Sequence, residues 1–426
     1  MGGLLALYAF DDLWNLSNHI YYGLTALDHR GSEKYVACTI GNGKVKCYKG
    51  SKERISKEIT TPLAIAATCS NEDMDIYLGT YSTNDLEFVM IGDRYSKIID
   101  IVGEKVASRL SSSNTSIANK VLTAFKEVLD EFKGRDIPSF LAITNRGEIL
   151  AYRSSKGLTP LTLGGYGFDL ALISSESRAI DILGGEVRKW LRPNELLYLS
   201  KYAVENVRVN SNGVEHLCAF ELLYMARHDS IVDGVSVYEF RKFLGRTLAR
   251  HLDADVDIVV GVPETAIPYA VGLAQAINKP FEIGFVGTGR HMRSALRIDP
   301  LQKLIAIHLK MNPVVHVLEG KKVALVDDSM VTGATMKTVS QILRYRVGVK
   351  ELHVVIASPP LVKSCPYRLM PIDIKSLLAA NLDTENAVKY LEVDSLTWIK
   401  PEVLSEVARS FNIRLCGKCF GVDFVG

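Results

Sequence analysis

The feature that most constrains the fold is an alternation of apolar strands and amphipathic helices that begins after about residue 211. Strand-like VDIVVGVP precedes helix-like TAIPYAVGLAQAI, KKVALVDD precedes TMKTVSQILRYRV, and ELHVVIASPP is a further strand. This order is typical of a parallel sheet with helices on both faces. We therefore predict an α/β domain with a doubly wound parallel sheet over residues 211–426.

Residues 1–210 follow a different pattern, in which short strand-like runs such as GLLALYAF, KYVACTI and LEFVMIG dominate. About thirty residues from Ile101 to Phe132 have helical spacing, and FLAITNRGEILAYRS indicates a hairpin around NRGE. The sequence predicts a first domain of sheets packed with helices over residues 1–210, of the α+β kind.

The composition excludes several classes of function. A net charge of +2 gives no electrostatic reason to expect a nucleic acid partner. No apolar run approaches the roughly 18–20 residues that span a bilayer, and the start of the chain lacks a basic signal-peptide region, so we expect no membrane partner and a cytoplasmic protein. Seven cysteines in such a chain favour metal or catalytic roles over a disulfide framework.

The stretch VALVDDSMVTGAT at Val323–Thr335 carries the clearest chemistry. Asp327 and Asp328 stand at the carboxyl end of an apolar strand, where ligands of open α/β sheets bind. A loop of small and hydroxyl residues then leads into a helix, whose unpaired N–H groups and dipole favour an anion. Two carboxylates repel a phosphate, so the aspartates are better suited to vicinal hydroxyls or a cation. A sugar phosphate satisfies both the aspartates, with its hydroxyls, and the loop, with its phosphate. We expect the phosphate to be held by Ser329, Thr332, Gly333, Ala334 and Thr335.

Adjacent aspartates before a helix are also common as N-caps. The whole stretch, however, resembles the phosphoribosyl pyrophosphate (PRPP) signature of type I phosphoribosyltransferases. The resemblance implies that Asp327 and Asp328 hold the ribose 2′ and 3′ hydroxyls and are candidate contacts of a Mg²⁺–PRPP complex. It also implies that the loop Ser329–Thr335 holds the 5′-phosphate.

Along most of its length the chain resembles glutamine PRPP amidotransferases, the first enzymes of purine synthesis. The resemblance rests on YYGLTALDHRGSE, ISSESRAIDILG, ELLYMARHDSIVDGVSVYEFRKFLGRTLA, LKMNPV and ASPPLV. The family implies an N-terminal-nucleophile (αββα) glutaminase-like domain over 1–210 and a type I phosphoribosyltransferase domain over 211–426. It also implies a homo-oligomer, and purine nucleotides as additional ligands.

Four cysteines match the iron–sulfur ligands of the cluster-bearing branch of that family, and four thiolates are what a [4Fe–4S] cluster requires. They are Cys218, Cys365, Cys416 and Cys419. Zinc or redox roles and ordinary buried thiols are the alternatives. The remaining Cys38, Cys47 and Cys69 are expected to be core residues.

The first half departs from the family where glutamine would react. The family begins Met-Cys-Gly, whereas this chain begins Met1-Gly2-Gly3, so position 2 has no nucleophile. The His-Val-Arg-Tyr-Ser-Thr segment is echoed only by LGTYST, with Thr80 in place of the glutamine-clamping arginine, and no counterpart of His-Asn-Gly-Asn is found. We expect no glutaminase activity.

The second half departs less. The diphosphate loop, usually Pro-Asp-Ser-Gly, reads Pro263-Glu264-Thr265-Ala266, where Ala266 is expected to strain the backbone. Thr332 replaces a common arginine of the phosphate loop. Arg290, Arg293 and Lys310 are candidates to stabilise the leaving group, with Arg297 nearby. Glu264, Thr265 and Asn312 complete the predicted PRPP contacts.

Two classes of function follow from these departures. The first is an enzyme that makes 5-phosphoribosylamine from PRPP and ammonia, with ammonia from solution or from a partner. The second is a non-catalytic paralogue that senses PRPP or nucleotides, or that regulates an active amidotransferase. A redox-sensing role for the cluster is a third hypothesis.

Overall fold

A computed structural model describes residues 2–69, 76–112, 120–209, 216–287, 311–370 and 373–422. The chain divides into two compact units. The first comprises Met1–Cys218 with Ser230–Gly234, and the second comprises Ala219–Asp229 with Val235–Gly426. The chain therefore crosses between the units after Cys218, after Asp229 and after Gly234.

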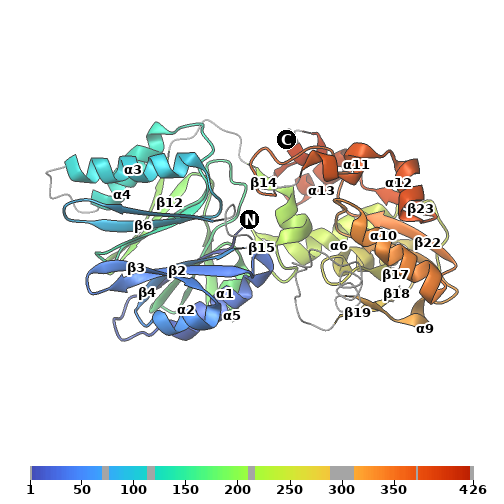
Figure 1. Ribbon diagram of the computed structural model, residues 1–426, viewed down its shortest axis with the longest axis horizontal. Coiled ribbons are helices and arrows are strands. Elements are labelled where there is room, and N and C mark those ends of the chain that lie inside the picture. Colours follow the sequence, from blue (N-terminus) through green and yellow to red (C-terminus); the bar gives the residue numbers. More distant parts are fainter. Residues whose placement is uncertain are drawn as a thin grey trace. The chain divides into compact units, whose positions relative to one another are not determined.

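The first unit is a four-layer sandwich, in which two antiparallel sheets lie between two layers of helices (Figure 1). One sheet contains, in spatial order, β11 (Glu186–Trp190), β9 (Thr162–Tyr166), β10 (Leu170–Ser174), β1 (Leu4–Ala9), β4 (Leu63–Cys69), β2 (Lys34–Gly41) and β3 (Lys44–Gly50). The other contains β13 (Ala203–Arg208), β12 (Glu195–Ser200), β8 (Ile149–Tyr152), β7 (Phe140–Thr144), β6 (Glu87–Gly92) and β5 (Tyr77–Ser82).

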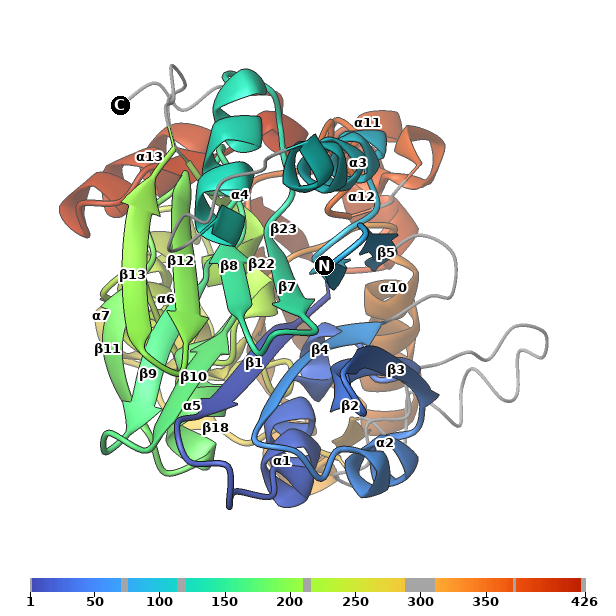
Figure 2. The same cartoon turned by 90° about the vertical axis from the view of Figure 1, so that its left-hand side faces the viewer.

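Helices cover the outer face of each sheet. The first sheet carries α1 (Ser17–Ala26), α2 (Lys52–Glu58) and α5 (Ser177–Ile182), and the second carries α3 (Lys97–Ser112) and α4 (Lys120–Glu131), as Figure 2 shows. A third apolar core fills the space between the two sheets. The helical stretch predicted from Ile101 to Phe132 is thus two helices, and the NRGE hairpin is confirmed by the antiparallel pairing of β7 with β8.

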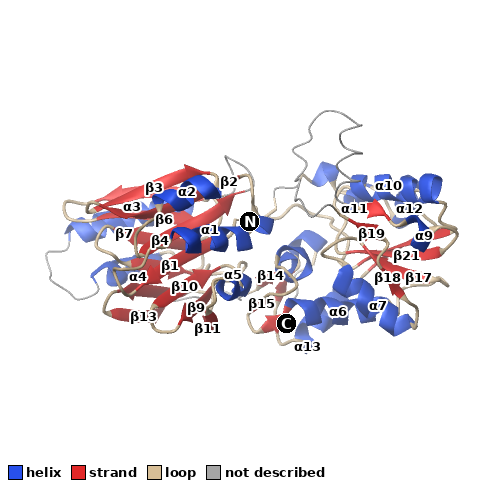
Figure 3. Cartoon of the chain, turned by 90° about the horizontal axis from the view of Figure 1, so that it is seen from below, coloured by secondary structure: helices blue, strands red, loops and turns tan. Residues whose placement is uncertain are grey.

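The second unit is built on a five-stranded parallel sheet, and Figure 3 shows helices on both of its faces. Its strands are, in spatial order, β18 (Phe281–Glu282), β17 (Ile258–Gly261), β21 (Lys322–Asp327), β22 (Glu351–Ile356) and β23 (Ser395–Trp398). Val323–Val326 and Leu352–Ile356 are buried throughout, because a parallel sheet covered on both faces needs strands that are apolar on both sides.

Helices and short elements complete the chain. The helices are α6 (Val237–Leu248), α7 (Ile267–Ile277), α9 (Val315–Leu318), α10 (Ala334–Gln341), α11 (Leu378–Asn381), α12 (Thr384–Leu391) and α13 (Pro401–Ser410). Two π-helical segments span Glu221–Met225 and Ile342–Val347, and short 3₁₀ turns span Asp28–Arg30, Ile374–Ser376 and Lys418–Phe420. The short strands are β14 (Leu217–Cys218), β15 (Ile231–Val232), β16 (Val235–Ser236), β19 (Phe285–Val286), β20 (Asn312–Pro313) and β24 (Leu415–Cys416).

An αββα sandwich followed by a parallel-sheet unit is the fold class that the sequence predicts. In the described part of the chain, no helix has both the length and the apolar character needed to cross a bilayer.

Candidate functional site

Apart from Asn312, the described residues predicted to bind PRPP lie at the carboxyl edge of the parallel sheet in the second unit. Strands β17 and β21 pair in parallel with Gly261 opposite Val326, so both strands leave the sheet at the same edge. The Val262 N–H donates to the Val326 carbonyl at 2.9 Å, which holds the two exits together. The turn with Glu264 and Thr265 and the pair Asp327–Asp328 therefore start side by side, as a site shared by two loops requires.

The two aspartates are oriented by local hydrogen bonds. The Asp328 N–H donates to Oδ1 of Asp327 at 2.9 Å, and the Ser329 hydroxyl donates to Oδ1 of Asp328 at 2.6 Å. Asp328 is buried and Asp327 is half-buried. The hydroxyl of Ser329 is thus engaged with a carboxylate in this structure, and it would have to rotate in order to donate to a phosphate.

The loop after the aspartates leads into α10 through a left-handed residue. Gly333 has φ 70° and ψ −6° and precedes the first helical residue, Ala334, with no side chain capping the helix. The Thr332 hydroxyl accepts a hydrogen bond from the Ala334 N–H at 3.3 Å. Thr332 and Thr335 are exposed. Backbone donors at the start of α10 can therefore reach an anion at this edge of the sheet.

The other predicted PRPP residues are placed as follows. Glu264 is exposed and Thr265 half-buried in the turn before α7, and Asn312 lies in β20, opposite Val286 of β19. Ala266 has φ −84° and ψ −8°, which any residue adopts, so the backbone strain expected at this alanine is not found. Arg290, Arg293, Arg297 and Lys310 lie outside the described residues.

Three of the four predicted cluster ligands lie in the second unit. Burial raises the pKa of the Cys419 thiol to about 12, and the neighbouring Cys365 and Cys416 act in the same direction. Cys218 ends the main segment of the first unit, and the second unit begins at Ala219. Within the second unit, the ring centroids of Phe220 and Phe420 are 5.6 Å apart. Among the described residues no group of three or more His, Cys, Asp or Glu side chains is arranged as a metal site.

Cys38 and Cys47 form a disulfide in the first unit, so the expectation that both are plain core residues is wrong. They face each other across β2 and β3, with Cα atoms 4.1 Å apart. Cys38 is buried whereas Cys47 is exposed. The sequence held a signal for this pair, because both cysteines are four residues from the turn Asn42-Gly43, whose residues have φ 55° and 72° as a tight hairpin requires.

The residues around Gly2 and Gly3 differ from those singled out in the sequence. The Gly3 N–H donates to the Thr68 hydroxyl at 2.9 Å, and the Gly2 N–H donates to the Asp93 carbonyl at 3.3 Å. Thr80, by contrast, lies on β5 at the edge of the other sheet and is exposed. Thr68 and Asp93 come from the ends of β4 and β6, and only the pairing of distant strands brings them to this place.

The carboxylate of Asp93 is part of a hydrogen-bonded and charged network with Thr159, Arg94 and Asp136. Its Oδ2 accepts a hydrogen bond from the Thr159 hydroxyl at 2.5 Å, and its Oδ1 lies 3.2 Å from Nη1 of Arg94. Arg94 also pairs with Asp136 at 2.8 Å. Burial raises the pKa of Asp93, and the charge of Arg94 opposes that shift. The residue whose carbonyl contacts Gly2 thus has its carboxylate engaged with other side chains.

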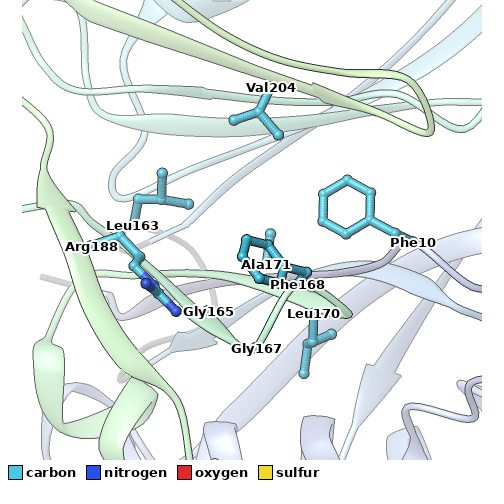
Figure 4. Close-up of a pocket in the computed structure, with 10 residues that line it drawn as sticks. Phe10, Leu163, Gly165, Gly167, Phe168, Leu170, Ala171, Arg188 and Val204 are labelled. Atoms are coloured by element: carbon cyan, nitrogen blue, oxygen red, sulfur yellow. The ribbon is translucent and has the colours of Figure 1, made fainter.

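A cavity of about 290 Å³ lies near the opposite end of β1 in the first unit (Figure 4). Phe10, Leu163 and Val204 give it an apolar lining, small residues such as Gly165 and Ala171 leave it open, and Arg188 is its charged residue. None of the residues predicted to bind PRPP or a cluster lines it.

Comparison with known proteins agrees with this geometry. The family model of the phosphoribosyl transferase domain matches residues 239–364, which include both strand exits and the loop before α10. The amidophosphoribosyltransferase of Methanothermobacter thermautotrophicus is 26% identical over 450 residues, covering 99% of this chain and 94% of that protein. That of Archaeoglobus fulgidus is 36% identical over 266 residues, covering 61% of this chain and 57% of that protein.

Solved structures match over the same extent. The glutamine PRPP amidotransferase from B. subtilis, complexed with ADP and GMP, superposes with a TM-score of 0.78 at 25% identity and covers 98% of this chain and 96% of its own. A structure of the allosteric regulatory enzyme of purine biosynthesis has the same fold, with a TM-score of 0.82 at 24% identity over 98% of this chain and 95% of its own. The chain is therefore a homologue of the amidophosphoribosyltransferases along nearly its whole length, and its second unit contains a phosphoribosyltransferase domain.

Proposed function

We propose that the second unit binds PRPP and transfers its phosphoribosyl group to ammonia, which yields 5-phosphoribosylamine and diphosphate. The observation that carries this proposal is the common edge of β17 and β21, where the turn with Glu264 and the Asp327–Asp328 pair leave the sheet side by side. Full-length homology to amidophosphoribosyltransferases supports the choice of an amine as the acceptor.

In this proposal Asp327 and Asp328 accept hydrogen bonds from the ribose hydroxyls, and the loop before α10 holds the 5′-phosphate with backbone N–H groups. Ammonia attacks the anomeric carbon, the bond to diphosphate breaks with its electrons leaving on oxygen, and the new amine loses one proton. Positioning and charge neutralisation supply most of the acceleration. Glu264, Thr265 and Asn312 remain predicted contacts, and Mg²⁺, when bound with PRPP, neutralises part of the diphosphate charge.

Glutamine is not the nitrogen donor in this proposal. Position 2 is glycine, which has no side chain that could attack an amide. Asp93, whose carbonyl accepts a hydrogen bond from the Gly2 N–H, has its carboxylate paired with Arg94, which also pairs with Asp136. This arrangement favours a first unit that has lost glutamine chemistry.

A direct test uses the purified full chain with PRPP and Mg²⁺. Diphosphate release should depend on added ammonium and rise with pH as more of it is present as NH₃. Glutamine at the same concentration should give no glutamate and no diphosphate. Glutamate formation would contradict the assignment of the first unit, and ammonia-independent or absent release would contradict the assignment of the second.

A second candidate is a non-catalytic protein that senses PRPP or purine nucleotides, or that regulates an active amidotransferase. It is favoured by the bond between the Thr332 hydroxyl and the Ala334 N–H, which occupies a donor that a phosphate would use. It is also favoured by the altered diphosphate loop, which reads Pro263-Glu264-Thr265-Ala266. Saturable PRPP binding without diphosphate release would support this candidate over the enzyme.

We also propose that Cys218, Cys365, Cys416 and Cys419 hold a [4Fe–4S] cluster. The electrostatic influence of Cys365 and Cys416 on Cys419 supports the convergence of these three cysteines. Burial raises the pKa of the Cys419 thiol, and a bound cluster would stabilise its thiolate form. Protein prepared anaerobically should be brown and contain about four irons per chain, and a colourless, iron-free preparation would contradict the proposal.

A further inference from the structure

The tip of one hairpin belongs to the first unit although its sequence neighbours belong to the second. Ser230–Gly234 are assigned to the first unit, whereas Ala219–Asp229 and the chain from Val235 onward are assigned to the second. The tip joins β15 to β16, and Asp233 and Gly234 have φ 50° and 82°, which a two-residue hairpin turn requires.

A buried arginine fixes this hairpin tip. Nη1 and Nη2 of Arg153 donate to the two carboxylate oxygens of Asp233 at 2.6 and 2.7 Å. The same two nitrogens donate to the carbonyls of Leu191 at 2.6 Å and Gly157 at 3.1 Å. The Arg153 side chain is 3% exposed. Such a bidentate, desolvated pair fixes both the distance and the orientation of the hairpin tip.

A second buried charge fixes the start of the tip. The Ser230 hydroxyl donates to Oε2 of Glu176 at 2.9 Å, and the Ile231 N–H donates to the Ser177 hydroxyl at 2.9 Å. Oε1 of Glu176 interacts with His29 at 2.6 Å and with Arg30. Glu176 is completely buried, yet these two partners keep it ionised. Ser230 therefore has a rigid, charged acceptor.

The segment that ends at this anchor packs beside the predicted diphosphate turn. Arg241 of α6 donates to the carbonyls of Leu222 and Ala226 at 2.8 and 2.7 Å. The Tyr269 hydroxyl donates to the Leu223 carbonyl at 2.9 Å, and Tyr269 lies in the first turn of α7, directly after that turn. Burial lowers the pKa of His228, Arg241 acts in the same direction, and the charge of Glu264 in the turn opposes the shift.

We propose that Arg153 and Asp233 are positioning residues for the transferase site. With Ser230 and Glu176 they fix one end of Ala219–Asp229, and this segment in turn orients His228 and the start of α7 at the diphosphate turn. This inference rests on the proposed function of the second unit.

The test compares three variants of the full chain. Asp233→Asn removes the charge that Arg153 needs, and Ser230→Ala removes the single bond to Glu176. Asp12→Asn is the control, since it removes another ion pair of the same unit, the exposed one between Asp12 and Lys201 at 2.7 Å. Amide hydrogen exchange over residues 219–229 and PRPP affinity by calorimetry are measured for each.

We expect faster exchange over residues 219–229 and PRPP binding weakened roughly 2- to 30-fold in the two hairpin variants, with the control unchanged. A merely structural role would lower the unfolding temperature and speed exchange in the hairpin, but would leave residues 219–229 and PRPP affinity as they are, and that result overturns the inference. If Asp233→Asn does not fold, Ser230→Ala decides. If the unaltered protein does not bind PRPP, the proposed function fails, and exchange over residues 219–229 alone decides the positioning role.

Discussion

Replacing Gly333 by alanine tests whether the loop before α10 depends on its left-handed residue. Gly333 has φ 70°, and a Cβ there would lie 3.1 Å from Cδ2 of Leu378 and 3.3 Å from Cδ2 of Leu391. The left-handed conformation costs a non-glycine residue about 1–2 kcal/mol. The two leucines must also shift, so the free energy of unfolding of the second unit should fall by about 1–2 kcal/mol or slightly more. A displaced loop loses at least one charge-assisted hydrogen bond to phosphate, about 1.5–3 kcal/mol, which weakens PRPP binding roughly 10- to 150-fold.

The matched control is Gly320→Ala. Gly320 has φ 67°, and a Cβ there would meet nothing within 4 Å, so this variant should show the conformational cost without the contact and without a loss of PRPP affinity. Urea unfolding gives the stabilities, and calorimetric titration with PRPP and Mg²⁺ gives the affinities. If Gly333→Ala binds PRPP as tightly as Gly320→Ala does, the phosphate is not held by this loop and the reasoning is refuted.

Three further predictions concern single side chains. Asp327→Asn should weaken PRPP binding by about 1.5–3 kcal/mol, because a charged acceptor becomes a neutral amide; unchanged affinity in calorimetry would refute the diol assignment. Burial opposes ionisation of Glu176, but Arg30 and His29 hold its pKa well below the usual range, so its stabilising contribution is present above the unfolded pKa of about 4.3 and is lost as the pH falls below it. Glu176→Gln should therefore have a lower free energy of unfolding at neutral pH, and this free energy should fall less steeply as the pH is lowered from about 5 to about 2. Circular dichroism follows unfolding at each pH, and equal slopes for the variant and the unaltered protein would exclude this role. Cys47→Ser opens a disulfide that spans a sequence separation of 9, and should lower the free energy of unfolding by about 2–3 kcal/mol; alkylation of Cys38 and Cys47 in unreduced native-sequence protein would show that the bond is absent.

Local signals in the sequence were enough to predict where the residues of one stretch of the candidate site lie in the fold. Asp327, Asp328 and Gly333 follow one another at a strand end, so the apolar run and the turn residues together determine where they lie. The same holds for the hairpin around Asn145–Glu148, which depends on two adjacent runs.

Features that need distant partners could not be predicted in this way. The neighbours of Gly2 and Gly3 come from the ends of β4 and β6, whose places follow from the pairing of the whole sheets. Ser230 and Asp233 read as part of a continuous second domain, because nothing local in their sequence points to Glu176 and Arg153 as acceptor and donor. The strain expected at Ala266 was wrong because the turn uses an ordinary helical conformation there.

The three crossings of the chain limit how this protein can be divided. A protein whose halves are joined by one linker can be cut in that linker, and each fragment then keeps all of its own residues. Here a fragment that starts at Ala219 would still carry Ser230–Gly234, and the carboxylate of Asp233 would be left without the guanidinium of Arg153. Separate expression of the transferase unit therefore calls for a redesigned tip, in which Asp233 is replaced by a neutral turn residue such as asparagine.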